Sequence, residues 1–152
     1  MKHREMSIVL KVMDFLSIAA ALFVACAVIP SVEAAKMVPA GASVAFGIGV
    51  LPLIALAVVA WQLFSAIGRG ETFVAENAAR LRTMSVLAAV DAAIWLAEII
   101  VYALAEPAPE LSVTGTLSVA LIITVAMCML CVVLSHLTLR AAALKDENDL
   151  VV

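Results

Sequence analysis

Four long apolar stretches constrain the fold of this chain more strongly than any other feature of its sequence. A helix needs about 18 or more apolar residues to cross a hydrocarbon core roughly 30 Å thick. Stretches of that length run over residues 9–30, 43–67, 83–104 and 117–139. Hydrophobic residues make up 66% of the 152 positions and charged residues only 14%, too few to cover a water-soluble domain. The sequence therefore predicts a single integral membrane domain over residues 1–152.

Helices rather than strands are expected within the membrane. Each stretch is rich in Ala and Leu and is apolar on every face, whereas the strands of a membrane barrel alternate over about ten residues. We therefore expect an all-α protein whose four transmembrane helices pack as an antiparallel bundle. A hairpin at residues 68–82 would join the second and third helices, and a tail at 140–152 would follow the fourth.

The basic residues predict how the spans are oriented. Eight of the nine Lys and Arg residues lie before the first stretch or near its start, between the second and third, or after the fourth; they are Lys2, Arg4, Lys11, Arg69, Arg80, Arg82, Arg140 and Lys145. Only Lys36 lies in another gap. Basic residues near the spans bias their loops to remain cytoplasmic. The sequence thus predicts a multi-pass protein of the cell membrane with both termini in the cytosol.

The first stretch also resembles a secretory signal followed by a cleavage site at Val32-Glu33-Ala34. Lys11 and Asp14 interrupt the apolar core that such a signal requires. We therefore expect this stretch to be retained as the first span.

The three cysteines favour packing over chemistry. Cys26, Cys128 and Cys131 all fall inside predicted spans, and the last two have the C-x-x-C spacing of redox and metal motifs. No second pair of Cys or His accompanies them to complete a tetrahedral site. We expect Cys128 and Cys131 to be small apolar side chains on a packing face, and we expect no metal ion, no cofactor and no catalytic residues.

The third stretch carries the most unusual chemistry, because Asp91 and Glu98 lie seven residues apart and so share one helical face near the middle of the bilayer. Further members of that face are Met84, Ala88, Trp95 and Tyr102. A carboxylate facing lipid at this depth would cost at least about 2.5 kcal/mol, so the face should point inward. Possible partners are Lys11, Gln62 and His136, while Lys11 and Asp14 could instead satisfy each other near the inner end of the first span.

Two interpretations of these acids remain open. In one, the polar residues Asp91, Glu98, Trp95, Lys11 and Asp14 belong to an intramembrane site for a proton, a cation or a cationic ligand. In the other, the acids form hydrogen bonds across the bundle and fix its packing. A kink at Pro52, near several glycines of the second stretch, would open a cavity toward the outer face.

The hairpin has clear local signals. Gly68 and Gly70 are expected to end the second helix with positive φ angles, and Thr72 is expected to cap the next helix with Glu76 in its first turn. Phe73, Asn77 and Leu81 recur every four residues on one face.

The order of residues in the hairpin is distinctive. A Phe and an Ile end the second span, Gly-x-x-Phe follows, and then an Asn and a Leu-Arg pair lead into the third; these positions are Phe64, Ile67, Gly70, Phe73, Asn77, Leu81 and Arg82. The tail over residues 144–152 has a Leu-Lys pair, acidic and Asn residues, and a short aliphatic end. Together these features resemble the bacterial four-span membrane family called domain of unknown function 2975. The resemblance covers essentially the whole chain, although the first span and first outer loop match no motif.

The resemblance implies a protein whose gene commonly neighbours that of a small Cro/CI-like helix-turn-helix regulator. A non-enzymatic regulatory membrane protein that binds this partner is therefore expected. The acidic tail would suit a basic DNA-binding surface. The expected contact residues are Gly70, Phe73, Asn77, Arg80, Leu81, Leu144, Asp146, Glu147 and Asp149.

The alternative is a small bundle that senses or transports a ligand or ion through the intramembrane acids. The cytosolic segments are too short for direct binding of nucleic acid through a helix-turn-helix. The Ala- and Gly-rich faces would permit homo-oligomers.

Overall fold

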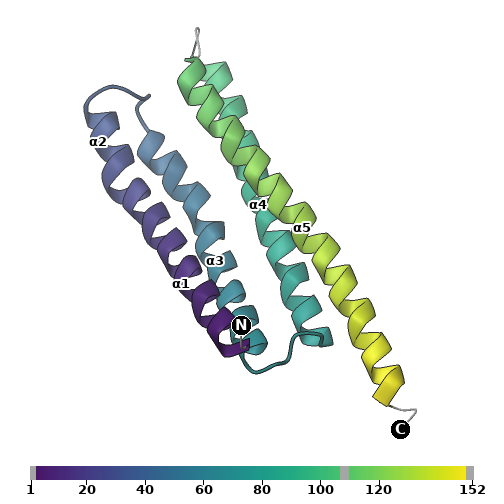
Figure 1. Cartoon of the computed structure of the whole chain (residues 1–152). Helices are drawn as coiled ribbons and strands as arrows, with labels where there is room; N and C mark the ends of the chain where they lie inside the picture. Colours follow the sequence, from purple (N-terminus) through teal and green to yellow (C-terminus); the bar gives the residue numbers. More distant parts are fainter. Residues whose placement is uncertain (1–2, 107–109, 150–152) are drawn as a thin grey trace.

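The computed structural model describes residues 3–106 and 110–149, which are helical apart from the connections between helices (Figure 1). The elements are α1 (His3–Phe23), a π-helical segment (Val24–Val28), α2 (Ile29–Ala34), α3 (Ala42–Gly68), α4 (Ala75–Ala105) and α5 (Leu111–Asp149). This part of the chain contains no strand, which confirms the all-α prediction for it.

Four helical stretches in the described part are long and apolar enough to cross a membrane, as predicted. They are Arg4–Ala34, Ala42–Gly68, Ala75–Ala105 and Leu111–Lys145. Each contains one of the apolar stretches seen in the sequence and extends beyond it. Hydropathy marks only the part of a helix that suits hydrocarbon, whereas the helix itself continues until a capping or loop signal ends it.

The first span contains an irregularity whose cause is visible in the sequence. α1, the π-helical segment and α2 follow one another without a break. Pro30, near the start of α2, has no N–H to donate to the carbonyl of Cys26, four residues earlier. The wider turn of the π-helical segment accommodates this missing hydrogen bond.

The helices pack in chain order. α1 contacts α3, α3 contacts α4, and α4 contacts α5 over the most extensive interface. Within the described residues, the backbone of α1 approaches neither α4 nor α5. The arrangement is therefore open between α1 and α5, where a closed bundle would have a fourth contact.

Figure 1 shows the start of α1, the end of α5 and the connection at residues 69–74 at one end of the molecule. We call this the proximal end, and the opposite end, with the connection at residues 35–41, the distal end. α5 extends past the other helices at the proximal end (Figure 1). Both ends of the described chain therefore lie at the proximal end.

The closely packed core lies in the proximal half, between α3, α4 and α5. Its buried cluster consists of Ala60, Leu63, Leu81, Met84 and Cys131. Small side chains such as Ala and Cys allow membrane helices to approach closely and gain van der Waals contact. Cys131 thus acts as a packing residue, as expected.

Two serine hydroxyls join helices in the same half. Ser7 Oγ donates to the carbonyl of Phe64 at 2.6 Å, and Ser135 Oγ donates to the carbonyl of Ala78 at 2.7 Å. Gly68 permits the first contact, because a Cβ built there would lie only 2.8 Å from Ser7 Oγ. These bonds attach α1 to α3 and α5 to α4.

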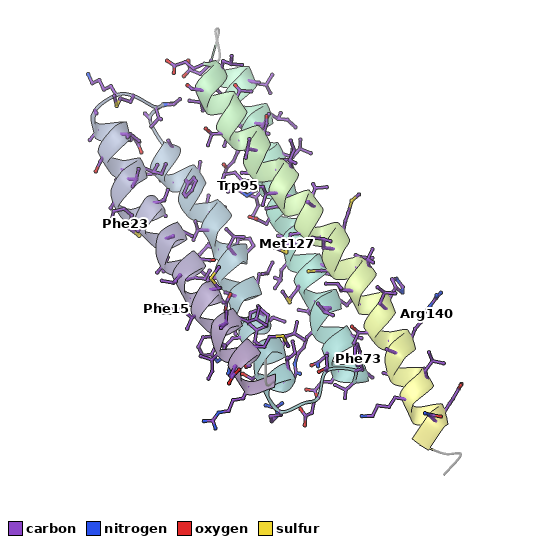
Figure 2. The ribbon with its side chains drawn as sticks, in the orientation of Figure 1. Phe15, Phe23, Phe73, Trp95, Met127 and Arg140 are labelled. Carbon is purple, nitrogen blue, oxygen red and sulfur yellow. The ribbon has the colours of Figure 1, made fainter. Side chains whose placement is uncertain are left out.

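Apolar side chains also cover the outside of the molecule. Phe15 and Phe23 are each 65% exposed, and Figure 2 shows them on the side of α1 away from α3. Trp95, in contrast, is 4% exposed and lies between α3 and the α4–α5 pair (Figure 2). An outer surface of this kind suits contact with lipid chains.

Candidate functional site

The connection between α3 and α4 begins with a Schellman turn. α3 ends at Gly68, and Gly70 has a φ of +83°. The N–H of Gly70 donates to the carbonyl of Ile67 at 3.0 Å, and that of Glu71 donates to the carbonyl of Ala66 at 3.1 Å. The prediction of a positive φ is confirmed for Gly70 and wrong for Gly68, which is still helical because the turn needs only one left-handed residue.

The predicted helix cap at Thr72 is also wrong. α4 begins at Ala75, and its capping residue is Val74, which is extended and makes no side-chain capping bond. Asn77 organises the loop instead: its Nδ2 donates to the carbonyls of Glu71 at 2.5 Å and Thr72 at 3.3 Å. The carbonyls of Glu71 and Thr72 point toward the helix and need a hydrogen-bond donor. The side-chain amide of Asn77 supplies one, whereas the hydroxyl of an N-cap residue would act as an acceptor.

Asn77 is part of a short chain of polar contacts. Arg80 Nη1 donates to Asn77 Oδ1 at 2.7 Å, and Arg80 also pairs with Glu76 one turn away. Asn77 is fully buried and Leu81 is 7% exposed. Of the expected contact residues, Asn77 and Arg80 therefore hold the loop, and Leu81 belongs to the buried core cluster. Gly70 is exposed and Phe73 is 54% exposed on the surface of the loop.

The tail continues α5 as a helix through Asp149. Residues 140–147 are rich in Ala, Leu, Lys and Glu, which favour helix strongly enough to carry it past the apolar stretch. Leu144 is 67% exposed, and Glu147 is exposed as well. Asp146 and Asp149 lie in this helix, but their side chains lie outside the described part, as do residues 150–152.

The face predicted on α4 does point inward. Met84, Ala88, Asp91 and Trp95 are all buried, with exposed fractions of 7% or less. The Trp95 ring packs edge-on against Phe46 at a centroid distance of 5.6 Å. It also lies against α3 at Gly49, where an added Cβ would come within 2.8 Å of the ring.

The two acids on this face have no hydrogen-bond partner for their buried oxygens. Asp91 is fully buried with both carboxyl oxygens unpaired, and Glu98 has its Oε1 buried and unpaired. The Trp95 indole lies close to the Asp91 carboxyl, one turn further along α4, without forming a hydrogen bond of normal geometry. The expected hydrogen bonds across the bundle are therefore not formed within the described residues.

Beside Glu98 lies a cavity of about 870 Å³ in the distal half. Its walls come from α2, the 35–41 connection, α3, α4 and α5. It reaches Trp95, Glu98 and Tyr102 on α4 and Glu106 just after that helix. This volume lies within the roughly 300–1,000 Å³ of sites that hold small molecules. Gly41 lines this cavity, whereas Gly47, Gly49 and Pro52 do not.

Glu33 shapes the connection that walls this cavity, a role the sequence analysis missed. Its carboxylate accepts hydrogen bonds from the N–H groups of Gly41 at 2.6 Å and Ser43 at 2.8 Å, and from the Ser43 hydroxyl. A carboxylate at the start of α3 also suits the positive end of the helix dipole. The sequence feature that could have predicted this role is the acid Glu33 shortly before Gly41-Ala42-Ser43, where α3 begins.

Lys11 and Asp14 lie elsewhere. Lys11 Nζ lies 5.0 Å from the centroid of the Trp61 ring, on the α1–α3 contact. Because α1 does not contact α4, neither residue joins Asp91 and Glu98. The part of the chain that the structure describes contains two ion pairs, Arg69–Glu71 and Arg80–Glu76, and neither includes Lys11 or Asp14.

Metal-binding groups do not gather in the described part of the chain. No three His, Cys, Asp or Glu side chains there lie close enough together to hold a metal ion. Cys26, Cys128 and Cys131 are free thiols.

Comparison with known proteins identifies one family. The family model described as "Protein of unknown function (DUF2975)" matches residues 27–152, which include α3, α4, α5 and all of the hairpin motif. Neither the curated proteins nor the solved structures gave a match.

Proposed function

This chain belongs to the DUF2975 family, and we propose that it is a non-enzymatic regulatory protein of the cell membrane that binds a small cytosolic helix-turn-helix transcription regulator. In this proposal the four spans form an antiparallel bundle and the proximal end faces the cytosol. The placement of eight of nine Lys and Arg residues supports that orientation.

The observation that carries the proposal is the proximal extension of α5. The helix has 39 residues and is therefore about 58 Å long, nearly twice the thickness of a hydrocarbon core. Its C-terminal turns extend past the other helices (Figure 1). Leu144 and Glu147 lie three residues apart and so share a face. A helix with an exposed apolar anchor and a neighbouring charge can bind in a groove of a partner.

The α3–α4 connection would form the second half of the docking surface. Asn77 and Arg80 hold the loop in one shape, and Gly70 and Phe73 lie exposed on it. A partner would then contact the loop at Phe73 and the α5 extension at Leu144.

Charge supports the choice of partner. Asp146, Glu147 and Asp149 give the end of α5 an acidic sequence. A DNA-binding surface is basic, and an acidic helix bound to it would compete with the phosphates of DNA. Sequestration at the membrane would therefore keep the regulator from its operator.

The test is affinity purification of the tagged protein from its own cells in mild detergent, with mass spectrometry of the proteins that co-elute. We expect a small helix-turn-helix protein in the wild-type sample. Removing residues 145–152, or making Leu144→Ala together with Phe73→Ala, should reduce its recovery at least tenfold.

Leu104→Ala is the matched control, because Leu104 is 84% exposed at the distal end of α4 and should leave recovery unchanged. Equal recovery of the regulator in all samples, or its absence from the wild-type sample, would contradict the proposal.

A further inference from the structure

We propose that the distal cavity binds an amphiphilic organic cation, with Glu98 as its counter-charge. This inference does not depend on a cytosolic partner. It rests on the size of the cavity, on the acids that line it and on the kind of side chains around them.

The cavity is long enough to hold a ligand. It extends along α4 from Glu106, just past the distal end of the helix, to Trp95, eleven residues earlier. At a rise of 1.5 Å per residue this is a length of about 16 Å. α2, α3 and α5 supply the other walls, so a molecule inside would be in contact with all four spans.

The walls carry negative charge without compensation. Glu98 and Glu106 line the cavity, and no Lys, Arg or His does so within the described part of the chain. Glu98 Oε1 is buried and makes no hydrogen bond. Asp91 lies two turns deeper, about 10 Å away along the axis, and is also buried and unpaired. A buried carboxylate is costly unless a cation accompanies it, and a bound cation would provide that partner.

Aromatic rings surround the same charge. Phe46, Trp95 and Tyr102 line the cavity together with Glu98. Aromatic faces attract organic cations, and the attraction is strongest where water is excluded. Most of the remaining lining is aliphatic, as in Ile48, Ile94 and Val101, and would contact an apolar body.

These features favour an organic cation over a metal ion. Hard metal ions require several oxygen ligands at one point. In the described residues no three His, Cys, Asp or Glu side chains gather in this way. The cavity instead offers one carboxylate within a wide apolar and aromatic surface, which suits a delocalised or alkylated cation.

The experiment uses the purified full-length protein in lipid nanodiscs and two probes of the same shape and opposite charge, tetraphenylphosphonium and tetraphenylborate. Binding is measured by equilibrium dialysis. The fluorescence of Trp95 is followed in a Trp61→Phe background, so that the signal comes from the tryptophan in the cavity. We expect saturable binding of tetraphenylphosphonium that changes Trp95 fluorescence, and no saturable binding of tetraphenylborate.

The variants separate charge from volume. Glu98→Gln keeps the size of the side chain and should weaken binding of tetraphenylphosphonium at least tenfold. Glu71→Gln is the matched control, because Glu71 lies in the α3–α4 connection at the proximal end and does not line the cavity, and it should change the affinity less than twofold. Ala45→Leu retains both acids but narrows the cavity, and should also weaken binding at least tenfold.

Equal affinity for tetraphenylphosphonium in the wild type and in Glu98→Gln would overturn the proposal, as would equal binding of tetraphenylborate. Because no partner protein is present in the assay, either outcome leaves the regulator-binding proposal standing. Loss of regulator binding in cells would likewise not affect this result.

Discussion

Asn77 and Asp91 are the two largest fully buried side chains in the described part of the molecule, yet their surroundings are opposite. Near the proximal end, Asn77 donates to two backbone carbonyls and accepts a hydrogen bond from Arg80. Four turns along the same helix, both oxygens of Asp91 are unpaired. The neighbouring structure differs in the same way, with the tightly packed cluster around Leu63 and Leu81 at the proximal half and a cavity of about 870 Å³ at the distal half.

This difference indicates that packing is uneven along the bundle. The proximal half fixes the helices through packing and paired polar groups, which also hold the α3–α4 connection in place. The distal half retains buried carboxyl groups without partners and an open cavity. Both lower stability unless a ligand pairs with the carboxyl groups and fills the cavity. Mutations should therefore have opposite consequences in the two halves.

The largest effect is expected in the proximal core. Leu81→Ala removes a buried side chain from the cluster between three helices and should lower the free energy of unfolding by about 2 to 4 kcal/mol. Leu104→Ala is the control on the same helix, because Leu104 is 84% exposed and should change stability by less than about 0.5 kcal/mol. Equilibrium unfolding in mixed micelles measures both. A similar loss of unfolding free energy in the two variants would show that the buried cluster contributes no more to stability than an exposed position on the same helix.

A smaller effect is expected where Trp95 of α4 packs against α3. Gly49→Ala places a Cβ within 2.8 Å of the Trp95 ring, and overpacking of this kind costs roughly 1 to 3 kcal/mol. Gly47→Ala has no atom within 4 Å of the new Cβ and should be neutral or slightly stabilising, since Ala favours helix over Gly. The same unfolding measurement compares them. Equal stability of the two variants would argue against close packing of Trp95 on α3.

The smallest effect is expected in the loop. Gly70 has a φ of +83°, so Gly70→Ala should cost about 1 kcal/mol through backbone strain. Gly115→Ala, in the regular helix α5 with open space around it, is the matched control and should not destabilise the protein. If Gly70→Ala were as stable as the control, the left-handed turn would not be needed to end α3.

Much of this fold follows from the sequence. Long apolar stretches and the seven-residue spacing of Asp91 and Glu98 predicted the four spans and the inward face of α4, because depth in a bilayer and helical periodicity are both encoded in residue order. The continuation of α5 past Leu139 was not predicted, since hydropathy does not report the end of a helix. The helix formers Ala and Glu in the tail did contain that information.

The site was predicted less completely, for reasons of tertiary geometry. Asn77 was taken as a contact residue, but the loop carbonyls that it binds are brought to it only by the turn after Gly70. Lys11 was placed with the intramembrane acids because both lie in spans, although nothing in the sequence shows that α1 packs on α3 alone. The role of Glu33 was missed, because its partners Gly41 and Ser43 lie eight and ten positions away.

The most direct test of the division between the halves is the unfolding free energy of Asn77→Leu and Asp91→Leu, measured side by side in mixed micelles. Both variants replace a fully buried polar side chain with an apolar one of similar size. We expect Asn77→Leu to destabilise the protein by about 1 to 3 kcal/mol, because it leaves polar groups without partners, and Asp91→Leu to stabilise it by about 1 kcal/mol or more. Destabilisation by both variants to a similar extent would contradict the account, since it would mean that Asp91 supports the fold as Asn77 does.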